Sequence, residues 1–271
     1  RAQSGTHDML ARLLGRPGHA ETQTGGQADA ISKHSEHDTM VALATALRLE
    51  DKALGAAATP VRLPWGVGFR ATSPNACFTV ESFLSADECK QLIEVSEARG
   101  YEAALVNVGG GRQMKIDEVR RSGRCIVDSM AAAELLWQRL RPFVPQEISP
   151  GVSTKWRAVG LNERLRFLRY APGDYFAPHC DGSFVHTDGA RKGQTSYMTV
   201  MMYLNEPKEG GETNFLNPRD EDDLVRVRPK PGMALCFDHR LLHEGAPLRK
   251  GVKYAIRTDV MFERIDEDDL R

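Results

Sequence analysis

Hydrophobic positions recur at helical spacing in the first half of the chain. Ser85 and Glu88 form the Ser-x-x-Glu pattern of a capping box, and the apolar positions that follow predict an amphipathic helix. A second helix is predicted over residues 129–140, where the same spacing ends before Pro142. Residues 39–54 carry a helix-like pattern nearer the N-terminus.

From about residue 165 the pattern changes to short runs of alternating or β-branched residues, separated by clusters of Gly, Pro and Asp. Gly210 and Gly211 fall between two such runs and predict a tight turn or bulge. Helices followed by strands predict an α+β fold, in which N-terminal helices buttress a double-stranded β-helix, the jelly-roll barrel of cupin-like proteins. The predicted strands span residues 164–170, 199–204, 212–216, 224–227, 233–237 and 253–262.

Composition divides the chain into two regions. Residues 1–60 are rich in Gly, Ala, Ser, Thr, Gln and His, which predicts a low-complexity tail with one possible helix. Residues 61–271 are predicted to form one domain, with helical support at 78–142 and a jelly-roll core at 163–264. With 271 residues and 41% hydrophobic positions, the chain is long enough for a sizeable core.

Charge and cysteine usage narrow the class of protein. The 36 basic and 37 acidic residues balance, so no nucleic-acid or membrane surface is indicated, and no apolar run has the length of a membrane span. The five cysteines (77, 89, 125, 180 and 236) lack Cys-x-x-Cys spacing and predict free thiols in a reducing compartment, the cytoplasm. The chain begins at Arg1 and not at Met, so this expectation leaves room for a preceding targeting segment.

Two histidines and an aspartate have the spacing of a metal site. Residues i and i+2 of a strand point to the same side, so His179 and Asp181 are predicted to hold one ion, with His243 joining from a distant strand. Two imidazoles and one carboxylate are the ligand set of non-haem Fe(II) oxygenases, which leaves coordination positions open for reaction. His186 and Asp188 repeat the His-x-Asp pattern, but no strand-like run precedes them, so a loop is predicted there.

These motifs resemble the prolyl 4-hydroxylase-like branch of the 2-oxoglutarate and Fe(II)-dependent dioxygenases. The resemblance covers about residues 78–262, and its motifs stand in the family's order. They are Tyr-x-x-Gly-x-x-Phe-x-x-His-x-Asp at 170–181, Thr-Val-Met-Met-Tyr-Leu-Asn at 199–205, Glu-Gly-Gly-Glu-Thr-Asn-Phe at 209–215, Pro-Gly-Met-Ala-Leu-Cys-Phe at 231–237, and His243 with Lys253 downstream.

The resemblance implies that His179, Asp181 and His243 bind Fe(II) and form the catalytic centre. It implies a dioxygenase that uses 2-oxoglutarate and O2 to hydroxylate a C–H bond, with release of succinate and CO2, and ascorbate as a further cofactor. The implied substrate is a prolyl or other side chain of a protein. Two alternatives stay open: a small-molecule hydroxylase of the same class, and a non-catalytic metal-binding sensor or interaction module on this fold.

Lys253 is implied as the salt-bridge partner of the 2-oxoglutarate C5 carboxylate, with Tyr170 and Thr199 beside the same cosubstrate. Tyr203 is a further candidate contact, although tyrosines in strands also serve as core residues. Arg257 shares the strand face of Lys253 and is a rival anchor, because its guanidinium can grip a carboxylate with two donors. The spacing from the second histidine favours Lys253.

Overall fold

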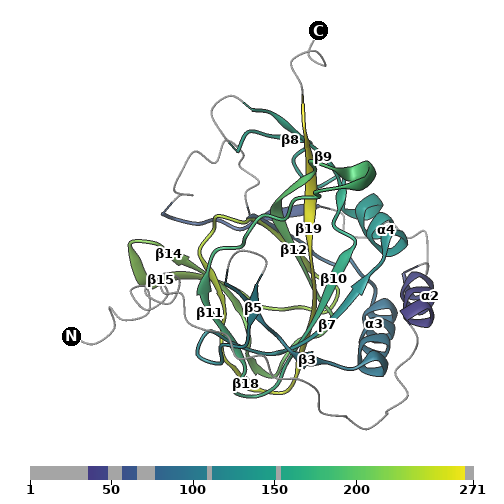
Figure 1. Cartoon of the computed structure of the whole chain (residues 1–271). Coiled ribbons are helices and arrows are strands. Elements are labelled where there is room, and N and C mark those ends of the chain that lie inside the picture. Colours follow the sequence, from purple (N-terminus) through teal and green to yellow (C-terminus); the bar gives the residue numbers. More distant parts are fainter. Residues whose placement is uncertain (1–35, 48–56, 66–76, 109–111, 151–153, 266–271) are drawn as a thin grey trace.

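The computed structural model describes residues 36–47, 57–65, 77–108, 112–150 and 154–265 (Figure 1). The helices are α2 (Glu36–Ala46), α3 (Ala86–Arg99), α4 (Met130–Leu140) and the 3-10 turn η1 (Gly189–Arg191). The strands are β1 (Ala58–Pro60), β2 (Cys77–Val80), β3 (Glu102–Ala103), β4 (Val106–Asn107), β5 (Gln113–Met114), β6 (Arg120–Arg121), β7 (Gly123–Asp128), β8 (Glu147–Ile148), β9 (Trp156–Leu161), β10 (Arg164–Tyr170), β11 (Tyr175–His179), β12 (Thr195–Tyr203), β13 (Glu209–Gly210), β14 (Thr213–Asn217), β15 (Asp220–Val227), β16 (Ala234–Asp238), β17 (His243–Gly245), β18 (Leu248–Lys250) and β19 (Lys253–Arg264).

A ten-stranded antiparallel sheet forms the framework of the molecule. Its order is β1-β2-β16-β12-β19-β10-β7-β3, and β9 joins it by pairing with β19 and β8. The long strand β19 lies between β12 and β10, so Arg257 faces Met201 on one neighbour and Arg166 on the other. Side chains alternate along β19: Ala255 faces the second sheet and Ile256 faces the helices.

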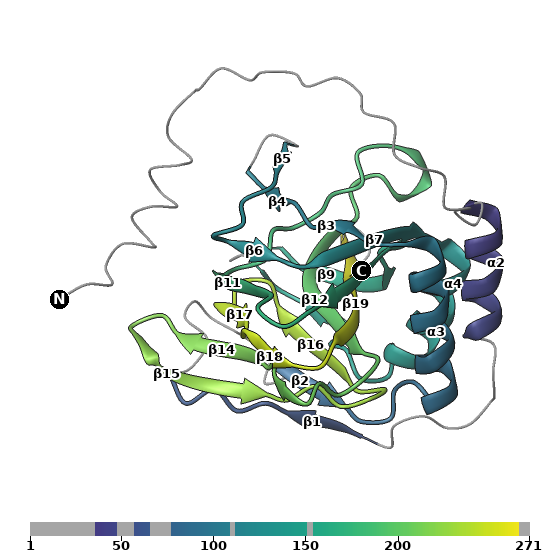
Figure 2. The ribbon, with the colours of Figure 1, turned by 90° about the horizontal axis from the view of Figure 1, so that it is seen from below.

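A smaller sheet with the order β15-β14-β17-β11-β6 packs against the framework. Aromatic residues such as Phe215 of β14 and Phe237 of β16 fill the space between the two sheets and meet edge to face. Figure 2 shows these strands on the side of the framework away from the helices, with the β14–β15 hairpin at the periphery. The described part of the chain is therefore mostly β-sheet, with two facing sheets and one layer of helices.

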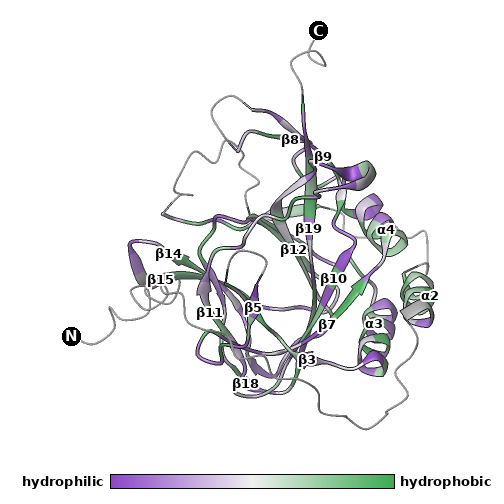
Figure 3. Ribbon diagram, in the orientation of Figure 1, coloured by the Kyte–Doolittle hydropathy of each residue, from purple (hydrophilic) through white to green (hydrophobic). Residues whose placement is uncertain are grey.

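The three α-helices cover the outer face of the ten-stranded sheet (Figures 1 and 2). The predicted capping box is confirmed, because Ser85 Oγ accepts from the Glu88 N–H while the Glu88 carboxylate accepts from the Ser85 N–H. Glu88 also pairs with Arg139 at 2.7 Å, which ties α3 to α4. Hydrophilic and hydrophobic positions alternate along α3 in Figure 3, as expected of an amphipathic helix. Among the described residues no helix combines the length and apolarity needed to cross a membrane.

The expected order of helices first and strands afterwards is wrong. Strands β1, β2, β3 and β7 come from the first half of the chain and belong to the large sheet. The sequence pattern missed them because they are short or lack alternation: all four residues of Cys77–Val80 are buried, as in a strand covered on both faces. Such runs resemble helix or loop segments when they are read alone.

The N-terminal helix differs from its prediction in position. It spans Glu36–Ala46, whereas residues 39–54 were expected, and part of that range lies outside the described residues. Leu43 is fully buried against the helical layer, and β1 pairs with β2. Described residues before position 61 thus contribute to the core, while the division of the chain into a tail and a domain stays a prediction.

Candidate active site

The two histidines of the predicted triad lie opposite each other on neighbouring strands. His179 ends β11, His243 begins β17, and the two are cross-strand partners. Strand alternation, the expected reason for a common orientation, does not reach Asp181, which lies beyond β11 where its N–H donates to the carbonyl of His239 at 2.9 Å. The ligand atoms of the three residues nevertheless lie within 4.8 Å of one another, and within the described residues they form the one such group of His, Cys, Asp and Glu.

Backbone carbonyls fix the tautomer of both imidazoles. Nδ1 of His179 lies 2.8 Å from the carbonyl oxygen of Ala177, and Nδ1 of His243 lies 2.9 Å from that of Leu241. A carbonyl can only accept a hydrogen bond, so Nδ1 carries the proton in each ring and Nε2 keeps its lone pair. The Nε2 atoms lie 3.6 and 3.7 Å from the two carboxylate oxygens of Asp181, so both lone pairs are available beside the carboxylate.

The electrostatics of the triad suit a cation. Burial, followed by the neighbouring His243, lowers the pKa of His179 to about 3, and burial also lowers the pKa of His243, so both rings are neutral at physiological pH. Burial alone would raise the pKa of Asp181, but the Arg257 guanidinium and the two imidazoles outweigh it and hold this pKa well below its usual range. One ionised carboxylate and two neutral imidazoles are the donors that Fe(II) takes in its oxygenases, so these residues fit iron.

Asp181 is held by side chains of the large sheet. Thr199 Oγ1 donates to Oδ2 of Asp181 at 2.5 Å, and Arg257 Nη1 lies 3.0 Å from Oδ1. Thr199, which was expected to border a cosubstrate, is fully buried and contacts the aspartate. Its hydroxyl therefore acts on the candidate ligand and not directly on the cavity.

Lys253 is a buried cation with no acid within ion-pair distance among the described residues, although Glu212 lies near enough to favour its charged form. Its Nζ donates to the Gly211 carbonyl at 2.6 Å and lies 5.2 and 5.4 Å from the ring centres of Tyr170 and Tyr203. It forms no ion pair with any residue that the structure describes, and burial lowers its pKa to about 8. The predicted turn at Gly210 and Gly211 is confirmed, since both have positive φ and Gly210 marks a bulge between β13 and β18.

A single cavity joins the triad to Lys253. Tyr170 lines it, as expected, whereas Tyr203 lies beneath the wall, where its hydroxyl shares a 2.7 Å hydrogen bond with Thr213. The cavity therefore brings a candidate metal site and a candidate carboxylate site together. The lining residues are Arg120, Leu168, Tyr170, Phe176, His179, Asp181, Met201, Thr213, His243, Glu244, Gly245, Lys253, Ala255 and Arg257.

The segment that carries these residues is similar to known proteins. Residues 165–258, which include every ligand candidate and Lys253, match the family model described as the 2OG-Fe(II) oxygenase superfamily. Over these residues the chain is similar to this superfamily. The predicted resemblance to its prolyl 4-hydroxylase-like branch is confirmed by curated relatives from Arabidopsis thaliana. They include prolyl 4-hydroxylase 1, 27% identical over 194 residues, and probable prolyl 4-hydroxylase 10, 28% identical over 198 residues.

The chain spans slightly less than two thirds of the length of these relatives. The alignment to prolyl 4-hydroxylase 1 spans 65% of each chain, and the alignment to probable prolyl 4-hydroxylase 10 spans 64% of each. Among solved structures, a Trichoplax adhaerens prolyl hydroxylase in complex with a hypoxia inducible factor peptide matches with a TM-score of 0.49 at 18% identity, over 72% of this chain and 86% of that one. The viral collagen prolyl hydroxylase of Paramecium Bursaria Chlorella virus-1 matches with a TM-score of 0.46 at 20% identity, over 69% and 96%.

Arg120 lines the same cavity, although the sequence pattern did not single it out. It lies on β6, is 9% exposed, and stacks its guanidinium 4.6 Å from the ring centre of Phe176. Phe176 in turn stacks on His179 at 3.6 Å, which supports the imidazole from one side. In the sequence, Arg120 and Arg121 are simply two adjacent arginines. One is buried and the other exposed because they alternate along β6, and a strand of two residues is too short to recognise from its pattern.

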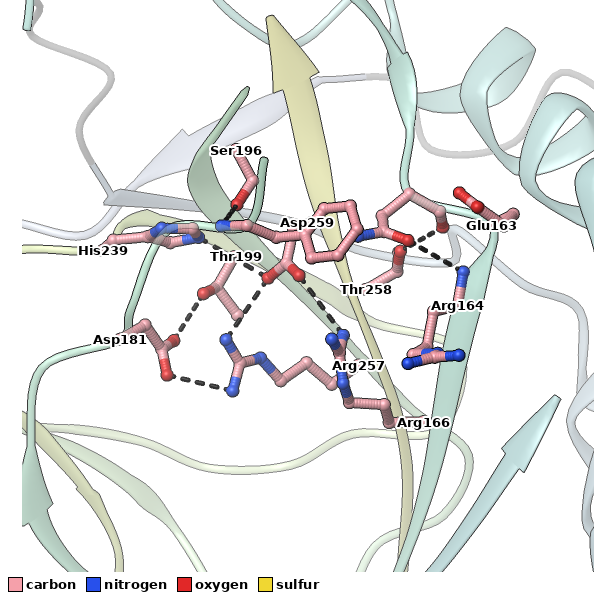
Figure 4. Close-up of polar contacts among 12 residues, drawn as sticks. Glu163, Arg164, Arg166, Asp181, Ser196, Thr199, His239, Arg257, Thr258 and Asp259 are labelled. Atoms are coloured by element: carbon pink, nitrogen blue, oxygen red, sulfur yellow. Dashed lines mark hydrogen bonds and ion pairs between the residues drawn. The ribbon is translucent and has the colours of Figure 1, made fainter. Parts of the chain in front are cut away.

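A buried ion network extends from the site into the large sheet, as Figure 4 shows. Arg257 Nη2 lies 3.3 Å from Oδ1 of Asp259. Arg166 Nη1 lies 3.2 Å from Oδ2 of Asp259, and His239 Nε2 lies 3.5 Å from Oδ1. The sequence did not reveal His239, because its partner comes from a strand far along the chain.

The second His-x-Asp copy lies outside the site. His186 belongs to the irregular segment before η1, as predicted, and its Nε2 lies 3.7 Å from a Glu163 carboxylate oxygen. The same glutamate pairs with Arg191 at 2.7 Å. His186 therefore helps to tether this loop, and the cavity lining does not include it.

Proposed function

We propose that the protein is an Fe(II)- and 2-oxoglutarate-dependent dioxygenase that hydroxylates a C–H bond. His179, Asp181 and His243 would hold the iron, and Lys253 would bind the C5 carboxylate of 2-oxoglutarate. When bound, iron, 2-oxoglutarate and O2 supply the oxidising chemistry, with release of succinate and CO2. The protein's own contribution is to position these groups and to keep the reacting C–H bond in a largely closed cavity.

One observation carries this proposal: a candidate iron triad and a buried lysine that forms no close ion pair with a described residue share one cavity. Burying an ammonium group is costly unless an anion pairs with it. A diacid that approaches the metal with its keto-acid end would bring its other carboxylate toward Lys253. Tyr170, whose ring lies beside the ammonium group, would line the path between the two ends.

The competing anchor has other partners. Arg257 pairs with Asp181 and with Asp259, so its two terminal nitrogens are already engaged. Among the described residues, the close contacts of the Lys253 ammonium group are a backbone carbonyl and two aromatic rings, and Glu212 acts on it from beyond ion-pair distance. This difference supports Lys253 as the residue that recognises 2-oxoglutarate.

We infer a peptide substrate, with a prolyl or other side chain as the hydroxylated group. The curated relatives are named as prolyl 4-hydroxylases, and one solved relative is described in complex with a peptide. The two facing sheets would form the double-stranded β-helix that the superfamily resemblance implies, with the cavity between them. A small-molecule hydroxylase of the same class is the outcome that a substrate screen must distinguish.

The test is succinate formation by the whole chain supplied with Fe(II), 2-oxoglutarate and O2. We expect slow turnover without substrate, and faster turnover with a prolyl peptide whose mass rises by one oxygen atom. If small molecules but no peptide stimulate succinate formation, the substrate is a small molecule and the inference of a peptide substrate is wrong. If iron binds but no succinate forms under any condition, the protein is a metal-binding module and the enzymatic proposal fails.

A further inference from the structure

Arg257 lies between two buried carboxylates: Asp259 on the same strand, β19, and Asp181 in the segment just beyond β11. Its Nη1 is 3.0 Å from Oδ1 of Asp181, and its Nη2 is 3.3 Å from Oδ1 of Asp259. Figure 4 shows the guanidinium reaching from β19 toward both acids. Asp181 and Asp259 are each 3% exposed at the side chain, so solvent screens neither contact strongly.

Asp259 is itself fixed from behind. Arg166 of β10 lies 3.2 Å from its Oδ2, and His239 lies 3.5 Å from its Oδ1. Burial alone would raise the pKa of Asp259, but Arg257 outweighs this effect and lowers the pKa to about 2, so the carboxylate stays ionised. Strands β10 and β19 and the turn after β16 therefore supply the support that the Arg257 guanidinium contacts.

The support extends to the other oxygen of the iron-binding carboxylate. Thr199 is the cross-strand partner of Asp259 and donates to Oδ2 of Asp181. Adjacent positions of the large sheet thus contact both oxygens of Asp181, which lies on an irregular segment outside any strand. Without these contacts the carboxylate would be free to rotate, because the backbone hydrogen bond from Asp181 to the carbonyl of His239 does not restrain the side chain.

We propose that Arg257 is a positioning residue that holds the Asp181 carboxylate in the orientation required for iron, and that Asp259 acts by holding Arg257. This role rests on the proposed iron site and deepens it. A buried cluster of ions is poor evidence of stability by itself, since apolar residues of similar size often stabilise a core equally well. Oriented support of metal-binding side chains is the use that partners of metal ligands commonly serve.

The test compares Mn(II) binding by the metal-free whole chain and its variants, measured by calorimetry. Arg257→Gln should weaken Mn(II) binding by about tenfold or more, because outer partners of metal ligands typically contribute tenfold to a hundredfold in affinity. Arg257→Lys keeps the charge but loses the two-pronged contact and should restore part of the affinity. Asp259→Asn does not touch the metal ligand and should weaken binding by a smaller factor in the same direction.

The exposed pair of Arg164 and Asp128 provides the matched control, since it also joins an arginine to an aspartate across two strands. Arg164→Gln should leave Mn(II) binding unchanged. Equal or tighter Mn(II) binding by Arg257→Gln would overturn the proposal. That result is expected if the guanidinium does not position Asp181 and only repels the metal ion by its positive charge. Thermal unfolding without metal identifies a variant that fails to fold, and the test then rests on Arg257→Lys and Asp259→Asn.

A second measurement separates this role from that of a cosubstrate anchor. At saturating Mn(II) and without O2, Arg257→Lys should bind 2-oxoglutarate with an affinity within about threefold of the unaltered protein. A large loss of 2-oxoglutarate affinity with unchanged Mn(II) affinity would assign Arg257 to the cosubstrate and reject the positioning role. If the unaltered protein binds no Mn(II), the proposed function itself fails, and this result is distinct from both outcomes above.

Discussion

The two ends of the cavity differ in how their charges are satisfied. At the metal end, Asp181 pairs with Arg257 and accepts a hydrogen bond from Thr199. At the far wall, Lys253 is as deeply buried, and among the described residues its hydrogen-bond partner is the carbonyl of Gly211. An unpaired buried charge is costly. The buried charges at the metal end pair with each other, whereas the ammonium group at the far wall would be stabilised by a bound anion.

This difference shows that position on a strand does not decide the role of a charged residue. Lys253 and Arg257 share one face of β19 and line the same cavity. The neighbours on adjacent strands separate them, since acids surround the arginine and aromatic rings surround the lysine. The predictions below test whether the two ends are as distinct in function as they are in charge.

The largest effect is expected at the metal end. His179→Ala and His243→Ala should each abolish 2-oxoglutarate turnover, because each removes one of three protein donors to iron. Both proteins should keep their fold by circular dichroism. His186→Ala is the matched control and should retain nearly full activity; an inactive His186→Ala with an active His179→Ala would place the site on the other His-x-Asp copy.

The next effect is expected at the far wall. Lys253→Ala should raise the 2-oxoglutarate concentration needed for half-maximal turnover by about tenfold to a hundredfold, because it leaves one carboxylate of the diacid unpaired. Its Mn(II) affinity should stay unchanged, unlike that of Arg257→Gln. The exposed Lys250 provides the control, and Lys250→Ala should leave the 2-oxoglutarate requirement unaltered. A loss of metal affinity in Lys253→Ala would contradict the separation of the two ends.

The sequence predicted the site better than the fold around it. His179, Asp181, His243 and Lys253 could be proposed because metal and carboxylate chemistry restricts the residue types and their spacing, and the structure places them around one cavity, while their roles stay predictions. Arg120 was missed, since a buried arginine on a two-residue strand has no local signature. Contacts that define its environment come from residues distant in sequence.

The same limit applies to the strands. Runs such as 164–170 and 253–262 were predicted because they are long and alternate in polarity, and β10 and β19 begin as expected. Strands of the first half were missed where both faces are buried or only two or three residues pair. Their extended conformation depends on neighbours such as β16 and β10 and not on their own pattern.

The pH dependence of cosubstrate binding should also report on the far wall. Burial lowers the pKa of Lys253 to about 8, so the free protein loses this charge as pH rises through 8. The affinity for 2-oxoglutarate should be steady below about pH 7 and fall above pH 8, by up to about tenfold per pH unit, because binding then requires uptake of a proton. Calorimetric titration with 2-oxoglutarate at pH values from about 6.5 to about 9.5, on both sides of the Lys253 pKa, measures this change in affinity. Arg stays charged throughout this range, so a Lys253→Arg protein that still binds should show a flat profile, and an identical fall would assign the titration to another group.

The smallest effect is expected for the support beneath the far wall. Tyr203→Phe removes the hydroxyl that shares a 2.7 Å hydrogen bond with Thr213 but keeps the ring beside Lys253. The free energy of unfolding should fall by about 1 kcal/mol, since a buried hydroxyl loses its partner, while the 2-oxoglutarate affinity changes by about twofold at most. Tyr254→Phe is the exposed control, because its hydroxyl bonds to Glu97 at the surface, and it should change stability by less. Chemical denaturation measures the free energy of unfolding of both variants. A loss of 2-oxoglutarate affinity in Tyr203→Phe as large as that in Lys253→Ala would show that the hydroxyl, and not the unpaired ammonium group, dominates recognition at this wall.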